Sequence, residues 1–207
     1  MNAYLVRHGQ SLGNLQNLHQ WPGAPLSPKG REQAKILAKR LTNIPIDIIY
    51  TSPLVRAKQT AEIISKELKL PIRYWKNLKE RKRPTELEGL PIDNPEAKEI
   101  ENQITENWLK GNWKYSDDES FENFKKRGQE IVKNLLIKHR EQNVLCVSHG
   151  AITKMIVCAT IFGEKLTPEV FWEFNNHTWD ENTGITHLEF TDKYGWSLLT
   201  WNDTTHL

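Results

Sequence analysis

Short apolar runs alternate with amphipathic segments along most of the chain. The runs have the length and the flanking turn residues of buried strands, and they occupy residues 3–6, 46–50, 71–75, 144–148, 184–190 and 196–201. Between them apolar positions recur at helical spacing, which predicts helices over 28–41, 54–68, 121–137 and 151–162. Ser27 and Pro28 provide an N-cap and a first helical residue for the first of these helices.

This alternation predicts an α/β fold, a three-layer α/β/α sandwich with a mostly parallel central sheet. A length of 207 residues falls within the usual range of one domain, so we expect a single domain over 1–207. Residues 78–118 break the pattern with Pro84, Pro91, Pro95 and many charges. We interpret this segment as a small cap-like insertion that leaves the sheet and covers a site.

Composition narrows the class of protein. Hydrophobic residues make up 38% of the chain and charged residues 26%, with a formal net charge of +2, which is typical of a globular protein and gives no reason to expect nucleic acid or membrane as a partner. The basic run at 76–83 is interspersed with acids, so we interpret it as a solvated cap face rather than an RNA surface. Cys146 and Cys158 are expected to be buried and reduced. Without a signal-peptide pattern at the N-terminus, we expect a cytoplasmic location.

Two of the predicted strands end in histidine followed by glycine, at His8-Gly9 and His149-Gly150. Parallel sheets place their sites at the carboxyl ends of their strands, so we expect both histidines at one site. An unprotonated imidazole is a competent nucleophile for a phosphoryl group, and we assign that role to His8. We interpret the two glycines as room for the phosphate beside the backbone, with free N–H groups of the helix near 151 aimed at it.

A phosphoryl dianion needs permanently charged donors, and its leaving alkoxide needs a proton. Arg7 and Arg56 are the candidate donors. Glu80 is the candidate acid, and once ionised it can activate the water that hydrolyses the phosphohistidine. Glu86 and Glu88 lie close by as alternatives. His149 is expected to contact the phosphoryl group, with capping of the following helix as the alternative.

These residues lie in blocks that resemble the histidine phosphatase superfamily, which includes cofactor-dependent phosphoglycerate mutase and the bisphosphatase of fructose metabolism. The resemblance spans most of the chain. The matching blocks, in order, are RHGQSLGN at 7–14, PLSPKG at 25–30, TSPLVRAKQTA at 51–61, LKER at 78–81, DES at 118–120 and SHG at 148–150.

The resemblance implies that His8 is the nucleophile, that Arg7, Arg56 and His149 hold the phosphoryl group, and that Glu80 is both acid and base. It implies no metal and no cofactor, and a small phosphomonoester as partner. The other five histidines lack metal-site spacing and are expected to be noncatalytic. A homodimer is the candidate assembly. Further residues expected to contact substrate are Gln10, Asn14, Gln20, Arg81, Gly150 and Ala151.

The branch of the family is indicated by two departures from the mutases. Ala151 stands where the mutases have asparagine after the second His-Gly, and a paired arginine segment is not found in the insertion. Residues 182–188 resemble the corresponding strand of the phosphatases better. We therefore predict a histidine acid-type phosphatase, a phosphoric monoester hydrolase. The alternatives are a cofactor-dependent phosphoglycerate mutase and a noncatalytic phospholigand-binding protein.

Overall fold

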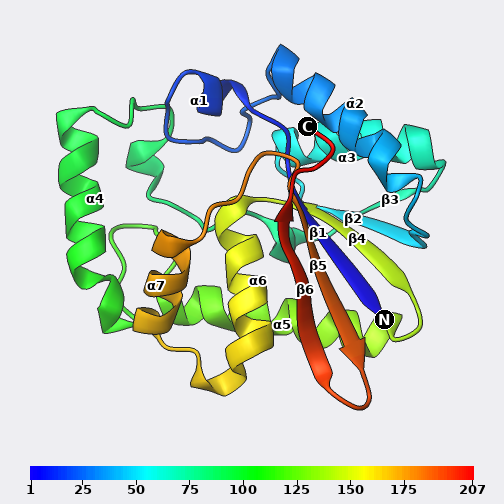
Figure 1. The fold of residues 1–207 in the computed structure, drawn as a ribbon. Coiled ribbons are helices and arrows are strands. Elements are labelled where there is room, and N and C mark those ends of the chain that lie inside the picture. The colour runs from blue at the N-terminus through cyan, green and yellow to red at the C-terminus, as the bar shows by residue number, and fades with distance from the viewer.

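The computed structural model describes all 207 residues and contains one six-stranded sheet in the order β3-β2-β4-β1-β5-β6 (Figure 1). Only β5 runs antiparallel to its neighbours β1 and β6, which confirms the predicted mostly parallel sheet. Each predicted strand is present within two residues at either end. The strands are β1 (Asn2–Arg7), β2 (Ile48–Thr51), β3 (Ile72–Tyr74), β4 (Asn143–Ser148), β5 (Ile185–Thr191) and β6 (Gly195–Asp203).

Seven α-helices and four short 3₁₀ helices complete the fold. The helices are α1 (Leu12–Leu15), α2 (Pro28–Leu41), α3 (Val55–Leu68), α4 (Pro95–Asn107), α5 (Phe121–His139), α6 (Gly150–Phe162) and α7 (Pro168–His177). The 3₁₀ helices are η1 (Lys76–Leu78), η2 (Thr85–Leu87), η3 (Trp108–Lys110) and η4 (Gly163–Lys165). The four predicted helices are confirmed, and the Ser27 hydroxyl caps α2 by accepting from the Gly30 N–H at 3.0 Å. Helices α1, α4 and α7 were not predicted.

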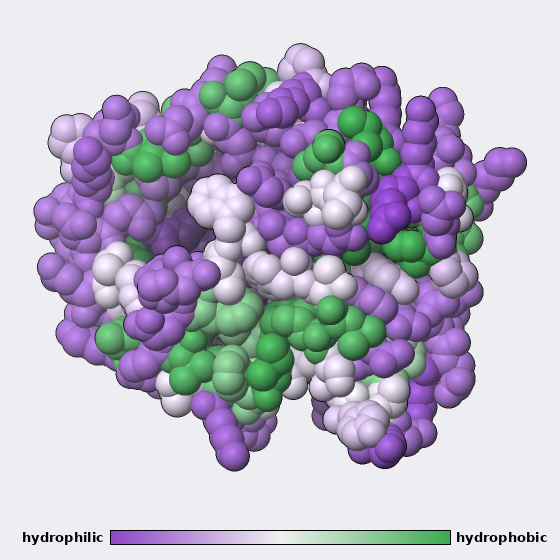
Figure 2. All heavy atoms as spheres, in the orientation of Figure 1, coloured by the Kyte–Doolittle hydropathy of each residue, from purple (hydrophilic) through white to green (hydrophobic).

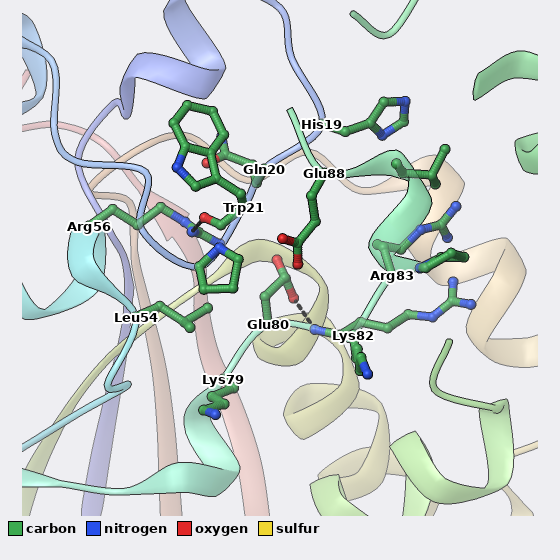
Figure 3. A pocket seen from close by; sticks show the side chains of 14 residues that line it. His19, Gln20, Trp21, Leu54, Arg56, Lys79, Glu80, Lys82, Arg83 and Glu88 are labelled. Atoms are coloured by element: carbon green, nitrogen blue, oxygen red, sulfur yellow. Dashed lines mark hydrogen bonds between the residues drawn. The ribbon is translucent and has the colours of Figure 1, made fainter. Parts of the chain in front are cut away.

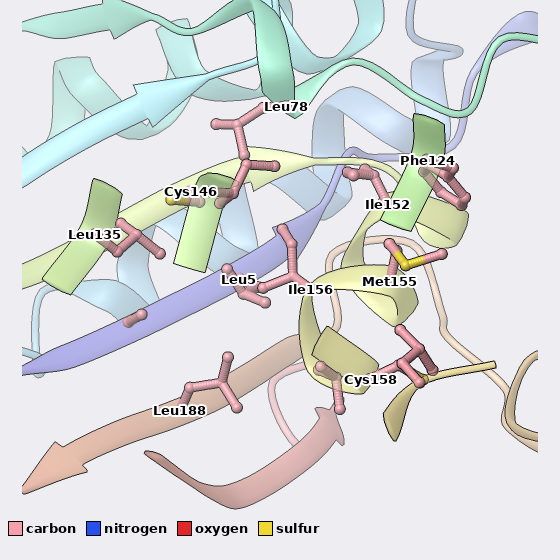
Figure 4. Close-up of a cluster of buried hydrophobic side chains, with 14 of the residues drawn as sticks. Leu5, Leu78, Phe124, Leu135, Cys146, Ile152, Met155, Ile156, Cys158 and Leu188 are labelled. Atoms are coloured by element: carbon pink, nitrogen blue, oxygen red, sulfur yellow. The ribbon is translucent and has the colours of Figure 1, made fainter. Parts of the chain in front are cut away.

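The sheet is covered on both faces, as the predicted three-layer fold requires. Side chains alternate along β1, so Leu5 joins the core beneath α5 and α6, whereas Val6 joins the core beneath α2 and α3. Figure 4 shows the larger core, with Leu5 and Ile156 meeting between sheet and helix. Full burial of such a side chain stabilises the fold by about 1.5–3 kcal/mol. Cys146 and Cys158 are free and buried within the same core, as predicted.

The segment 78–118 is more regular than predicted. It contains η2, α4 and η3, and α4 packs Ala97, Ile100 and Ile104 against Leu87 in a small cluster of its own. Backbone hydrogen bonds attach the segment to the loop after α1, from the His19 N–H to the Leu90 carbonyl at 2.9 Å among others. In Figure 1, α4 lies on the opposite side of the molecule from the β5–β6 hairpin.

The surface is mixed in character. Hydrophilic side chains cover much of the face in Figure 2, and apolar ones gather over the region that α6, α7 and β6 occupy in Figure 1. No helix combines the length and the apolar character needed to cross a bilayer.

Candidate active site

The two histidines meet because their strands are parallel neighbours in register. Arg7 at the end of β1 pairs with Ser148 at the end of β4, and the His8 N–H donates to the Ser148 carbonyl at 3.0 Å. His8 and His149 follow immediately, both buried, with their ring centroids 5.1 Å apart. The predicted convergence of the two strand ends is therefore present in the structure.

The hydrogen bonds of His8 define its neutral tautomer. Nδ1 lies 2.7 Å from the Gly9 carbonyl oxygen and must donate to it, while Nε2 accepts from Arg56 Nε at 3.0 Å. Burial and the positive charges of Arg56 and Arg7 hold the pKa of His8 well below its usual value. The imidazole is thus neutral near pH 7, with the Nε2 lone pair directed at a guanidinium.

Arg56 lies in the first turn of α3 and is buried against His8. Its Nη1 donates to the Trp21 carbonyl at 3.2 Å, so two hydrogen bonds fix the guanidinium plane. Burial lowers the pKa of Arg56 to about 10, which leaves the group charged near pH 7. Trp21 was not among the predicted site residues, because a backbone carbonyl carries no signal in the sequence.

His149 begins α6 by position, but its side chain makes no capping hydrogen bond. Its Nε2 instead lies 2.8 Å from Ser52 Oγ, while its buried Nδ1 has no partner. Burial, and then the charge of Arg56, keep the pKa of His149 well below its usual value. Ser52 directly follows the carboxyl end of β2. Because parallel strands place their carboxyl ends at the same edge of the sheet, Ser52 lies at the same edge as the two histidines.

Glu80 occupies the N-terminus of α6. Its carboxylate accepts from the Ala151 N–H at 3.2 Å and the Ile152 N–H at 3.1 Å, and also from the Arg81 N–H at 2.8 Å. A carboxylate at this position is favoured by the partial positive charge of a helix N-terminus. The prediction that free helix amides point at the phosphate is therefore wrong for these two N–H groups, since Glu80 accepts from both.

The interpretation of the two glycines is also corrected. A Cβ on Gly9 would lie 2.3 Å from the Gly30 carbonyl oxygen, and one on Gly150 would lie 2.7 Å from Asp180 Oδ2. Close packing within the protein thus accounts for both glycines: the backbone of α2 leaves no room for a Cβ at Gly9, and a Cβ at Gly150 would displace the Asp180 carboxylate.

A pocket of about 260 Å³ opens beside Arg56 and Glu80 (Figure 3). Gln20 and Arg81, two of the predicted substrate residues, also line it. Glu88 lines the same pocket, and Figure 3 shows its carboxylate directed toward the space that Glu80 faces. A second pocket of about 240 Å³ shares Glu80 and Arg81 and includes Ala151. Both pockets are bounded by residues of the 78–118 segment.

Gln10 and Asn14 are engaged within the protein and line neither pocket. The Ser27 hydroxyl donates to Gln10 Oε1 at 2.7 Å, and the Ser11 N–H donates to Asn14 Oδ1 at 3.2 Å. Gln20 hydrogen-bonds to the Ser11 hydroxyl as well. These amides brace the loop that follows His8.

Two contacts within the 78–118 segment hold Arg81 in place. Its Nη2 donates to Asp118 Oδ2 at 2.7 Å, and its guanidinium lies over the Trp108 ring at 3.6 Å. Burial lowers the pKa of Arg81 to about 10, so it remains charged near pH 7. Asp118 belongs to the DES block of the sequence, and its place beneath Arg81 gives that block a structural role.

The remaining histidines lie apart from this site or at its rim. His177 is exposed beside Glu173, and His19 lines the larger pocket 3.7 Å from Glu101. No three His, Cys, Asp or Glu side chains come together as a potential metal site. Metal independence stays a prediction.

Two buried histidines, two arginines and a carboxylate therefore come together at one edge of the sheet. The family model of the histidine phosphatase superfamily (branch 1) matches residues 3–204. The chain belongs to this superfamily.

Similar proteins are phosphatases and phosphoglycerate mutases. The putative phosphoserine phosphatase 2 of Hydrogenobacter thermophilus is 35% identical over 89% of this chain and 87% of its own. A 2,3-bisphosphoglycerate-dependent phosphoglycerate mutase of Bradyrhizobium sp. is 33% identical over 80% of this chain and 82% of its own. The crystal structure of a phosphoserine phosphatase variant from Entamoeba histolytica, in complex with phosphoserine, superposes with a TM-score of 0.81 at 26% identity, covering 100% of this chain and 98% of that one.

Proposed function

We propose that the protein is a phosphomonoester hydrolase that forms a phosphohistidine on His8 and acts on a small phosphorylated metabolite. The observation that carries the proposal is the buried, neutral imidazole of His8, whose Nε2 faces Arg56 at 3.0 Å. A neutral imidazole next to a fixed cation is suited to attack a bound phosphate dianion. The phosphatases among the similar proteins support hydrolysis.

In the first step the phosphoryl oxygens bind to Arg7, Arg56 and His149. Arg56 Nε, which donates to His8 Nε2 in the free protein, transfers its hydrogen bond to a phosphoryl oxygen and so frees the Nε2 lone pair. His8 Nε2 attacks phosphorus in line, the bond to the ester oxygen breaks, and Glu80, protonated when the dianion is bound, gives its proton to the departing alkoxide. In the second step water attacks the phosphohistidine, Glu80 takes a proton from that water, and the N–P bond breaks. Inorganic phosphate leaves, and both His8 and Glu80 return to their starting protonation states.

The leaving group is placed in the pocket beside Glu80, between Gln20 and Arg81. Ala151 contributes by donating its N–H to Glu80, and Gly150 by its close packing on Asp180. Gln10 and Asn14 act on substrate through the loop they brace. We further propose that residues 78–118 act as a cap within a single domain and that the protein is an acid-type histidine phosphatase. We also propose that it is cytoplasmic and forms a homodimer.

Phosphoglycerate mutase is the second candidate, because mutases are among the similar proteins. In a mutase the phosphohistidine returns its phosphoryl group to the isomerised product, so water must be kept from the intermediate. Ala151 lacks the amide that mutases have at this position, which favours hydrolysis. A noncatalytic binding protein is disfavoured by the presence of every proposed catalytic side chain in the site.

The test is phosphate release from a panel of phosphomonoesters, including phosphoserine, phosphoglycerates, sugar phosphates and para-nitrophenyl phosphate. Wild type and His8→Ala are compared with and without a metal chelator. The proposal expects release that the chelator leaves unchanged and that is lost in the variant. Interconversion of phosphoglycerates without release would select the mutase, and neither activity would select the binding protein.

A further inference from the structure

We infer that Asp180 is a positioning residue that holds the Arg7 guanidinium in the orientation needed for the phosphoryl group. The inference rests on the proposed function, since it assumes that Arg7 binds the phosphate. Asp180 lies in the segment between α7 and β5, outside every block that resembles the family. It is distant in sequence from Arg7 but adjacent to it in the fold.

Two groups of Asp180 face the guanidinium. Arg7 Nη1 donates to the Asp180 backbone carbonyl, and Arg7 Nε lies 3.6 Å from the carboxylate oxygen Oδ2. Both Nε and Oδ2 are buried and have no other hydrogen-bond partner. A movement of a few tenths of an ångström would join these two atoms, because hydrogen bonds in this class reach about 3.2 Å.

The Asp180 carboxylate is itself fixed from two sides. Lys154 Nζ lies 3.7 Å from its other oxygen, and the same ammonium donates to the carbonyls of Asn175 and Thr178 at 2.8 Å each. Gly150 packs directly on the carboxylate, as the 2.7 Å approach of a hypothetical Cβ shows. Burial raises the pKa of Asp180, while the charges of Arg7 and Lys154 oppose the rise. The carboxylate thus has one cation on either side.

The contacts with Asp180 leave Arg7 Nη2 available to a ligand. Nη1 and Nε, which lie on different edges of the guanidinium, are both turned to Asp180, whereas Nη2 makes no hydrogen bond to the protein. Contacts at two nitrogens hold the plane of the guanidinium, which reduces the entropy lost when Nη2 binds an oxyanion. The negative charge of Glu80 also raises the pKa of Asp180. The pair of Arg7 and Asp180 therefore lies close to the proposed acid as well.

The variant that tests the positioning role of Asp180 is Asp180→Asn, which keeps the size of the side chain and the backbone carbonyl but removes the charge. Simple electrostatics predicts tighter binding of inorganic phosphate, because a negative charge near an anion site is lost. The positioning role predicts the opposite. The inhibition constant for phosphate should rise by about tenfold or more, and kcat/KM should fall by about the same factor. Glu181→Gln is the matched control: it removes one charge from the same segment, where the side chain is exposed and bonded to Trp179.

The same substitution in an Arg7→Ala background completes a double-mutant cycle. The inference expects Asp180→Asn to weaken phosphate binding when Arg7 is present and to have little effect when it is absent. An equal effect in both backgrounds, unchanged binding or tighter binding would overturn it, because each would mean that Asp180 does not act through Arg7.

A crystal structure of wild type with vanadate, an analogue of the phosphoryl group in transfer, gives a test that needs no variant to fold. We expect vanadate at His8, Arg7 Nη2 on an oxyanion oxygen, and Nε within hydrogen-bond distance of Asp180. Vanadate at His8 with Arg7 turned away from Asp180 would overturn this inference alone. Vanadate bound elsewhere would contradict the proposed function.

Discussion

The imidazoles of His8 and His149 lie edge to face, with centroids 5.1 Å apart and their planes at 63°. Each has a separate fixing partner, Arg56 for His8 and Ser52 for His149. Two protonated imidazoles at this distance would repel each other and the nearby arginines, so the neutral form of both is favoured. The pair therefore gives the site two neutral imidazoles.

The lowered pKa values of these histidines make folding stability depend on pH. In the unfolded chain each histidine takes up a proton below its usual value of 6.5, whereas in the folded protein both stay neutral to lower pH. Stability is therefore expected to fall as pH drops below 6.5, by up to about 1.4 kcal/mol per pH unit for each histidine. Urea unfolding between pH 7 and 5 measures this slope. The free energy of unfolding of His149→Gln should depend less steeply on pH than that of wild type. An identical slope would mean that His149 is not held neutral by the fold.

Arg56→Lys tests the fixed cation beside the nucleophile. Lysine keeps the charge but loses the fork that joins His8 Nε2 to the Trp21 carbonyl. We expect kcat/KM to fall by about 10²–10³, the usual cost of one lost transition-state donor. Steady-state kinetics with an aryl phosphate measures the loss. Lys58→Arg, an exposed neighbour on α3, is the control, and near-wild-type activity of Arg56→Lys would mean that charge alone suffices.

Glu80 and Glu88 both line the pocket, and leaving-group dependence separates their roles. Glu80→Gln should slow hydrolysis of an alkyl phosphate by about 10²–10⁴, because its poor leaving group needs a proton, and should slow an activated aryl phosphate much less. Glu88→Gln should leave this ratio unchanged. If Glu88→Gln instead slows the alkyl phosphate much more than the aryl phosphate, Glu88 and not Glu80 is the proton donor.

Gly9→Ala tests whether the glycine after the nucleophile serves packing. The new methyl would meet the Gly30 carbonyl oxygen at 2.3 Å, and overpacking of this kind costs about 1–3 kcal/mol of unfolding free energy. Gly23→Ala is the control, since the nearest atom to its Cβ would be Trp21 Cδ1 at 3.5 Å. Thermal unfolding compares the two. A fully stable Gly9→Ala protein with weakened phosphate binding would restore the original interpretation of this glycine.

Most of the sheet and the meeting of the two histidines were predictable because they depend on local signals. A buried strand ending in His-Gly is recognisable at both His8 and His149, and parallel pairing then brings the two together. The same signals were present for two helices that were not predicted. Asn94 caps α4 and Thr167 caps α7, each followed by proline, as at Ser27.

Other parts of the site depend on contacts between distant segments, which periodicity does not encode. Asp180 reaches Arg7 across 173 residues, and the Trp21 partner of Arg56 is a backbone carbonyl. The position of Glu80 on the α6 amides likewise follows from how 78–118 folds back over the sheet. These contacts explain why the positions of the two histidines were predictable and those of the residues that hold the site together were not.

The proposed function requires His8 to carry the phosphoryl group during turnover. The most direct measurement is rapid quench of wild type with substrate into alkali, which preserves phosphohistidine, followed by intact and peptide mass spectrometry. We expect one added phosphoryl group, located on His8 and lost on acid treatment. Turnover with the phosphoryl group on a different side chain, or hydrolysis that persists in His8→Ala, would contradict it.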